Sequence, residues 1–293
     1  MIVKTMDLLA AAARGNYGVL AFNVIGLDHA EAIVLGAEVE QSPVILQVSQ
    51  NAIAFRLGLV GPIGRACEEL AAQTSIPVSL HLDHATTRGI CERAAAVGFS
   101  SIMYDGSSLS YEDNVRETAA LADWAHQIGL GIEGELGVVG GKDGVPTTRE
   151  GMTDPKMAAR YVSATGVDAL AVAVGTEHGM VERRAMLDLD RIARLHQEVP
   201  VPLVLHGSSG VADADLVAAV QRGMAKINLA TQLNTAFTGA IRSYLERDAA
   251  VVDPRRYGEQ GRTAMVEVVR DRCRLVGAAG KSQDFTAGVE QRS

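Results

Sequence analysis

The sequence has few residues of the kinds that specialised protein classes require. Only 4% of its 293 residues are aromatic, which argues against a base-stacking platform for single-stranded nucleic acid. Basic residues are outnumbered, with 27 Lys and Arg against 35 Asp and Glu, so the net charge is −8. A broad nucleic-acid footprint needs a basic face. We therefore predict no nucleic-acid partner.

Cysteine and long apolar runs are also scarce. Cys67, Cys91 and Cys273 are widely separated and form no CxxC pair, which excludes a disulfide framework and a thiolate zinc knuckle. Such cysteine usage predicts a reducing, cytoplasmic location. No apolar run approaches the roughly 18 residues that span a bilayer, and Asp7 and Arg14 interrupt the N-terminal apolar stretch. We predict an amphipathic N-terminal helix and no membrane association.

The overall composition, with 47% hydrophobic and 21% charged residues, is typical of a globular protein. Short, mostly apolar runs alternate along it with segments of helical spacing. The runs are Val19–Asn23, Val44–Val48, Val78–Leu82, Ser101–Tyr104, Leu130–Glu135, Ala169–Val174, Pro202–Leu205 and Ala225–Asn228. Nearly apolar strands that alternate with helices indicate a parallel sheet, in which both faces of each strand are buried. Eight such units predict an α/β fold, a (β/α)8 TIM barrel. The alternative, a doubly wound sheet, would need a GxGxxG after the first run.

The chain shows no internal domain boundary, so we predict a single barrel domain over residues 1–280. A C-terminal extra helix, roughly Gln260–Leu275, would cover the barrel or an oligomer partner. The polar segment 281–293 is predicted to be a disordered tail. Gly137–Gly151 is the one long loop, and such loops are either functional lids or disordered.

Polar residues stand at the predicted carboxyl ends of the strands, where barrel enzymes carry their chemistry. In chain order they are Asn23, Ser49, Asp83, His84, Asp105, Glu135, His178, His206, Gly207 and Asn228. Three imidazoles with an open fourth position are typical of catalytic zinc, so His84, His178 and His206 are the candidate ligands. The other histidines, His29, His81, His126 and His196, lie within or at the start of elements, and we expect structural roles for them.

The acidic residues at these ends have more than one interpretation. Asp83, directly before His84, is a candidate general acid and base, or a carboxylate that orients a histidine. Asp105 and Glu135 are candidate ligands of a second divalent or a monovalent cation. They could instead orient the histidines or form ordinary salt bridges at the rim.

Two segments are candidate phosphate sites. Gly207-Ser208-Ser209-Gly210 follows the seventh run and Asn228-Leu229-Ala230-Thr231 the eighth, and each is predicted to open a helix. Backbone N–H groups at helix N-termini bind phosphate, and the loops after strands seven and eight are the usual phosphate site of such barrels. Either segment alone fits an ordinary turn; together they favour a phosphate.

The sequence resembles the class II, zinc-dependent ketose-bisphosphate aldolases, which act on fructose or tagatose bisphosphate. The similarity spans nearly the whole chain. The motifs that carry it are AFNV at Ala21–Val24, LHLDHA at Leu80–Ala85, EGELGVVGG at Glu133–Gly141, GTEHG at Gly175–Gly179, VLHGSSG at Val204–Gly210, KINLAT at Lys226–Thr231 and DPRRY at Asp253–Tyr257.

The resemblance implies reversible aldol cleavage of a ketose (bis)phosphate into dihydroxyacetone phosphate and an aldehyde. One Zn²⁺ on the three histidines would stabilise the enediolate, and Asp83 would be the acid and base toward the aldehyde oxygen. Asp143 stands where the family places a mobile glutamate that removes the donor proton. The matching substrate and monovalent-cation surroundings are Asn23, Ser49, Gly179, Gly207, Ser209, Asn228 and Thr231. The family also implies a homodimer or homotetramer.

The departures from the family concern the substrate. Ala230 and Asn234 stand where fructose-bisphosphate members typically carry an Asp for sugar hydroxyls and an Arg for the distal phosphate. Glu182 replaces a lysine near the donor phosphate, followed by Arg183 and Arg184. These changes suggest an acceptor other than glyceraldehyde 3-phosphate. Fructose or tagatose 1,6-bisphosphate remains the first expectation, and the alternative is a single-phosphate substrate or an unphosphorylated aldehyde acceptor of a biosynthetic pathway. Two further alternatives are a metal-dependent hydrolase on the same barrel and a non-catalytic aldolase-like subunit.

Overall fold

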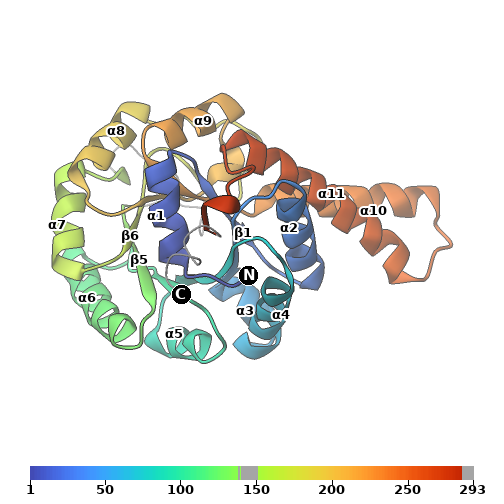
Figure 1. Ribbon diagram of the computed structural model, residues 1–293, viewed down its shortest axis with the longest axis horizontal. Helices are drawn as coiled ribbons and strands as arrows, with labels where there is room; N and C mark the ends of the chain where they lie inside the picture. Colours follow the sequence, from blue (N-terminus) through green and yellow to red (C-terminus); the bar gives the residue numbers. More distant parts are fainter. Residues whose placement is uncertain (138, 140–150, 286–293) are drawn as a thin grey trace.

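Eight parallel strands close into a barrel in the order of the sequence, each strand pairing with the next and β8 with β1 (Figure 1). The computed structural model describes residues 1–137, 139 and 151–285. The strands are β1 Val19–Asn23, β2 Val44–Ser49, β3 Val78–Ala85, β4 Ser101–Tyr104, β5 Gly131–Leu136, β6 Ala169–Val172, β7 Leu203–Leu205 and β8 Met224–Leu229. The predicted (β/α)8 barrel is confirmed.

Helices surround the barrel and cover the outer faces of its strands (Figure 1), which explains the many buried apolar residues of the strands. The N-terminal helix α1 precedes the first strand, as predicted. The helices are α1 Thr5–Gly15, α2 Leu27–Val39, α3 Gln50–Phe55, α4 Val60–Gln73, α5 Arg88–Ala95, α6 Tyr111–Gln127, α7 Pro155–Thr165, α8 Leu189–Glu198, α9 Asp213–Gln221, α10 Thr231–Arg247, α11 Pro254–Leu275 and the 3₁₀ turn η2 Ser208–Gly210.

Two helix starts differ from the predictions. The segment after β7 forms the separate turn η2, and α9 begins only at Asp213, so this segment does not open the helix. The extra C-terminal helix α11 begins at Pro254 rather than near Gln260, because Asp253 caps it by accepting a hydrogen bond from the N–H of Arg255.

Helices α10 and α11 pair with each other and extend away from the barrel (Figure 1), while α11 also packs along α2. Gly36 of α2 allows that close approach. A Cβ atom at Gly36 would lie 2.7 Å from Val269 Cβ and 2.9 Å from the backbone oxygen of Val266.

The predicted domain limits stay a prediction. Of the predicted tail, residues 281–285 belong to the described part, and the N–H of buried Ser282 donates to the backbone oxygen of Gln41 at 2.9 Å. Residues 286–293 lie outside it. Among the helices that the structure describes, none is long and apolar enough to cross a bilayer.

The glycine in the α2–α11 contact gives a stability prediction. Gly36→Ala is expected to lower the free energy of unfolding by about 1–2 kcal/mol, because overpacking outweighs the helix propensity that alanine adds. The control is Gly239→Ala in the middle of α10, where an added Cβ meets nothing within 4 Å. That change should raise the free energy of unfolding by about 1 kcal/mol. Parallel urea or thermal denaturation measures both, and equal stabilisation by the two changes would contradict the packing argument.

Candidate metal centre and active site

The three predicted histidine ligands meet at the carboxyl end of the barrel. His84 belongs to β3 and His206 follows β7 directly, whereas His178 lies beyond β6 in the connection to α8. One ring nitrogen from each lies within 4.8 Å of the others. The ring centroid of His84 is 4.7 Å from that of His206 and 5.1 Å from that of His178.

A backbone irregularity places two consecutive residues of β3 in the same pocket. Along a regular strand, side chains alternate between faces, so Asp83 and His84 would point to opposite sides. Here the pairing of β3 with β4 shifts register between Leu82 and Ala85, and His84 has a φ of 52°, in the left-handed region. A non-glycine residue in this region is strained by about 1–3 kcal/mol, and such strain is typical of functional sites.

Carboxylates determine which nitrogen of His84 and which nitrogen of His206 face the centre. Asp105 Oδ2 lies 2.9 Å from His84 Nδ1, and Glu133 Oε1 lies 3.0 Å from His206 Nε2. Because a carboxylate only accepts, these two nitrogens carry the hydrogens. The other nitrogens, His84 Nε2 and His206 Nδ1, then direct their lone pairs at each other across 3.1 Å.

Two lone pairs at this distance repel unless a cation lies beside them. Burial lowers the pKa of His206, although its hydrogen bond to Glu133 opposes the shift, so a second proton on this ring is disfavoured. The arrangement therefore fits a metal ion, and three imidazole nitrogens suit a first-row transition metal or zinc. His84, Asp105 and Glu135 form a second trio with the same spacing.

Asp83 is held by a directed chain of amides. Its Oδ2 accepts from Asn23 Nδ2 at 2.9 Å, and Asn23 Oδ1 accepts from Gln47 Nε2 at 2.8 Å. Oδ1 of Asp83 has no hydrogen-bond partner among the described residues. Burial by itself would raise the pKa of Asp83, but the proximity of His84 and His206 lowers it well below its ordinary value. Asp83 thus lines the pocket with its carboxylate oriented by Asn23, and its other oxygen lies 3.9 Å from His84 Nε2.

Most of the predicted substrate-binding residues line one pocket of about 190 Å³ together with His84 and His178. Its lining comprises Asn23, Ser49, Asn51, Asp83, His84, His178, Gly179, Gly207, Ser209, Asn228, Ala230 and Thr231. Ser208 and Leu229 are fully buried and do not line it, and the hydroxyl of Ser208 donates to the backbone oxygen of Leu205. Asp143 lies outside the described residues.

Gly207 is required by the local backbone. Its φ is 66°, and a Cβ atom there would lie 2.7 Å from the backbone oxygen of Glu177. The residue therefore lets the chain after His206 pass close to the loop that carries His178.

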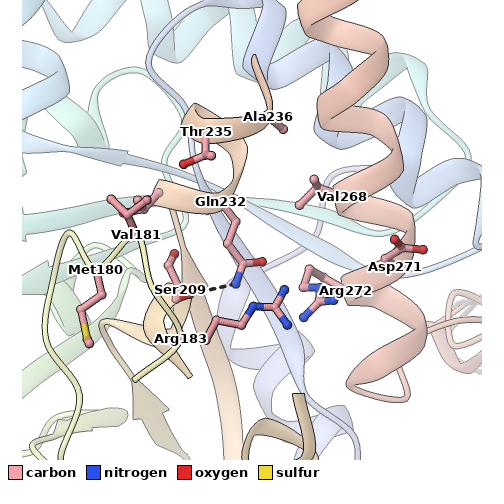
Figure 2. Close-up of a pocket in the computed structure, with 11 residues that line it drawn as sticks. Met180, Val181, Arg183, Ser209, Gln232, Thr235, Ala236, Val268, Asp271 and Arg272 are labelled. Carbon is pink, nitrogen blue, oxygen red and sulfur yellow. Dashed lines mark hydrogen bonds between the residues drawn. The ribbon is translucent and has the colours of Figure 1, made fainter. Parts of the chain in front are cut away.

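A second pocket, of about 340 Å³, adjoins the first, and Ser209 and Thr231 line both. Figure 2 shows the guanidinium groups of Arg183 and Arg272 side by side in it. Both donate to the carboxylate of Asp213, so two positive charges share this negative one. The side-chain amide of Gln232 donates to the backbone oxygen of Ser209 at 3.1 Å (Figure 2).

The two charged neighbours of Arg183 in the sequence, Glu182 and Arg184, do not line this pocket. Glu182 forms an ion pair with Arg184 at the exposed surface. Of Arg183 and Arg184, Arg183 is therefore the one that lines this pocket.

Five polar residues of the site were not anticipated. Gln47 supports Asn23, and Asn51 lines the pocket. Glu133, Lys226 and His81 form a buried group beneath the histidines. Strand alternation could have revealed the last three, because each stands two residues before a predicted site residue: Glu135, Asn228 and Asp83 respectively.

The comparison with protein families identifies the class. The family model for fructose-bisphosphate aldolase class II matches residues 3–281. The chain is 36% identical over 286 residues to a fructose-bisphosphate aldolase of Geobacillus stearothermophilus, covering 96% of this chain and 99% of that protein.

Solved structures agree. The YdjI aldolase of Escherichia coli K12 superposes with a TM-score of 0.86 at 30% identity, covering 96% of this chain and all of that one. The fructose-bisphosphate aldolase of Campylobacter jejuni superposes with a TM-score of 0.77 over 96% of this chain and 97% of that one; at 22% identity it supports the fold alone.

The chain belongs to the class II fructose-bisphosphate aldolase family. It is an aldolase, a lyase of a generally metal-dependent family, as the resemblance predicted. This membership sets aside the metal-dependent hydrolase that three histidines alone left open.

Metal removal should lower the thermal stability. A cation that binds only the folded chain adds about 4 kcal/mol at a free concentration 1,000-fold above its Kd. Treatment with EDTA is expected to lower the Tm, and Zn²⁺ or Co²⁺ but not Mg²⁺, which prefers oxygen ligands, should restore it.

Matched histidine variants locate the effect. His178→Ala should lose the rise in Tm on metal addition, whereas His196→Ala, an exposed histidine of α8, should keep it. Loss of the metal response in both variants, or in neither, would argue against the site.

Proposed function

We propose that the protein is a zinc-dependent aldolase that cleaves a ketose phosphate into dihydroxyacetone phosphate and an aldehyde, and catalyses the reverse condensation. The observation that carries the proposal is the approach of His84 Nε2 and His206 Nδ1 to 3.1 Å, with Asp83 Oδ1 3.9 Å from His84 Nε2. His84 and Asp83 line the same pocket as Ser209 and Thr231.

The residues of the chain have distinct roles in this proposal. His84, His178 and His206 hold the ion, which when bound supplies Lewis-acid polarisation of the donor carbonyl. Asp83 exchanges a proton with the oxygen of the aldehyde fragment, as its oriented and partly unpaired carboxylate would allow. Asp105 orients His84, because two hydrogen bonds from Ser107 occupy its other oxygen.

The phosphate site is proposed at the junction of the two pockets. Ser209, Thr231 and the backbone around Gly179 and Gly207 line the metal pocket near it. Arg183 adds a positive charge from the adjoining pocket. A phosphate there would accept a charge-assisted hydrogen bond from Arg183, whose guanidinium also donates to Asp213.

The remote end of the substrate is proposed to carry no second phosphate. Asn234 Oδ1 accepts a hydrogen bond from His29 Nε2 at 3.2 Å, so this position is used in packing against α2 and supplies no positive charge. Ala230 lines the pocket without a carboxylate. These features favour an unphosphorylated aldehyde over glyceraldehyde 3-phosphate, and full activity on fructose or tagatose 1,6-bisphosphate would refute that choice.

A homodimer or homotetramer is also proposed, with the projecting α10–α11 pair as its contact (Figure 1). The predicted cytoplasmic location stays a prediction.

Proton exchange tests the function without a choice of aldehyde. Dihydroxyacetone phosphate in deuterated water should lose its exchangeable carbon proton when the protein is added, and the NMR signal should persist when a chelator is present. Exchange that is absent from the zinc-loaded protein would refute the proposed donor.

Asp83→Asn separates the two halves of the reaction. We expect it to lower carbon–carbon cleavage about 100-fold or more and to retain proton exchange, because Asp83 serves the aldehyde oxygen. Loss of exchange together with cleavage would contradict that role.

Arg183→Ala tests the phosphate subsite. We expect the KM for dihydroxyacetone phosphate to rise about 10- to 100-fold, the effect of losing one charge-assisted hydrogen bond, while the KM for unphosphorylated dihydroxyacetone stays unchanged. The matched control is Arg184→Ala, whose arginine pairs with Glu182 at the surface. Equal effects of the two variants would exclude Arg183 from the subsite.

A further inference from the structure

The interior of the barrel holds a charged group beneath the metal-binding histidines. Lys226, Glu133 and His81 are each fully buried. Lys226 Nζ lies 2.7 Å from Glu133 Oε2 and 3.0 Å from His81 Nε2, and Glu133 Oε1 lies 3.0 Å from His206 Nε2. One positive and one negative charge are thus enclosed together, directly behind a candidate metal ligand.

These contacts run across the barrel rather than along its hydrogen-bonded wall. Lys226 belongs to β8, Glu133 to β5 and His81 to β3, and no two of these strands are neighbours. A buried ion pair is costly unless its geometry satisfies both charges, and similar apolar side chains often fill such a space without loss of stability. Stability alone therefore does not account for a lysine at this position.

The direction of every hydrogen bond in the group follows from the lysine. An ammonium group only donates, so Glu133 Oε2 and His81 Nε2 both accept from Lys226. His81 therefore carries its hydrogen on Nδ1, which donates to Ser101 Oγ at 2.7 Å, and Ser101 donates in turn to Thr5 of α1. Burial, with the nearby charge of Lys226, lowers the pKa of His81 to about 3, so this ring is neutral.

Glu133 connects Lys226 to the candidate metal ligand His206 by hydrogen bonds. With Oε2 taken by Lys226, Oε1 is the oxygen that receives the hydrogen of His206 Nε2. That hydrogen bond leaves Nδ1 as the nitrogen that faces His84. A His206 ring without this acceptor could carry its hydrogen on either nitrogen and turn about its side-chain bonds.

We propose that Lys226 is a positioning residue of the metal centre, which acts through Glu133 to hold His206 with Nδ1 presented to the ion. The inference rests on the proposed metal site and not on the identity of the substrate. It predicts that removing the lysine weakens metal binding even though Lys226 touches neither the ion nor any of the three histidine ligands.

Lys226→Met is the first variant. The Kd for Zn²⁺, measured by competition with a chromogenic chelator, should rise about 10- to 100-fold, as is usual when a residue that orients a metal ligand is lost. The visible absorption spectrum of the Co²⁺-loaded protein should also change, because it reports the ligand geometry directly.

Two further variants separate positioning from folding. Glu133→Leu with Lys226→Met replaces the ion pair by apolar side chains, so the metal-free protein should keep its Tm while the Kd for Zn²⁺ stays raised. Ser101→Ala removes a buried hydrogen bond at the other end of the group, where Glu133 is not involved. It should lower the Tm and leave the Kd for Zn²⁺ within about twofold of the original protein.

Metal affinity that is unchanged in Lys226→Met, or that falls in all three variants in proportion to their loss of Tm, would overturn the proposal. Failure of the proposed function gives a different result. If the unsubstituted protein binds Zn²⁺ but exchanges no proton of dihydroxyacetone phosphate, the proposed reaction is refuted. The role of Lys226 is then still decided by the Kd values of the variants for Zn²⁺. An original protein that binds neither Zn²⁺ nor Co²⁺ would refute both.

Discussion

Asp105 and Glu133 each accept a hydrogen bond from one histidine, and the whole centre depends on that pair of interactions. Each carboxylate takes one nitrogen of its ring, so the opposite nitrogens must converge. The resulting approach of two lone pairs is unfavourable in an empty site and favourable around a cation. A cation bound between His84 Nε2 and His206 Nδ1 would remove the repulsion between their lone pairs. This physical reason for metal binding does not depend on the family to which the chain belongs.

The polar interior of the barrel is built in two layers by strand alternation. On each of β3, β5 and β8, two polar residues stand two positions apart. The pairs are His81 with Asp83, Glu133 with Glu135, and Lys226 with Asn228. The first residue of each pair belongs to the buried ionic group, and the second lies nearer the carboxyl end, at the metal site or its pocket. One face of each strand thus carries both the reactive groups and the groups beneath them.

The proposed recognition of the substrate uses a different part of the molecule. Arg183, Gln232 and Arg272 come from the loop after β6 and from α10 and α11, outside the strands. Asn234 is engaged with α2 instead of the pocket. The candidate metal ligands, on the strands or in the segments that follow them, and the proposed recognition residues farther out can therefore vary independently, as is usual for barrel enzymes.

Much of this protein follows from local patterns in the sequence. Apolar strands repeated eight times specify the parallel barrel, and polar residues at the strand ends mark His84, His178 and His206, because side-chain alternation and strand ends are properties of neighbouring residues. The tertiary structure alone decided the pairing of Lys226 with Glu133, which are 93 residues apart, and the left-handed backbone at His84 that turns Asp83 and His84 into one pocket. Both depend on the register and closure of the barrel, which bring together side chains from strands that are not neighbours and which no short stretch of sequence contains.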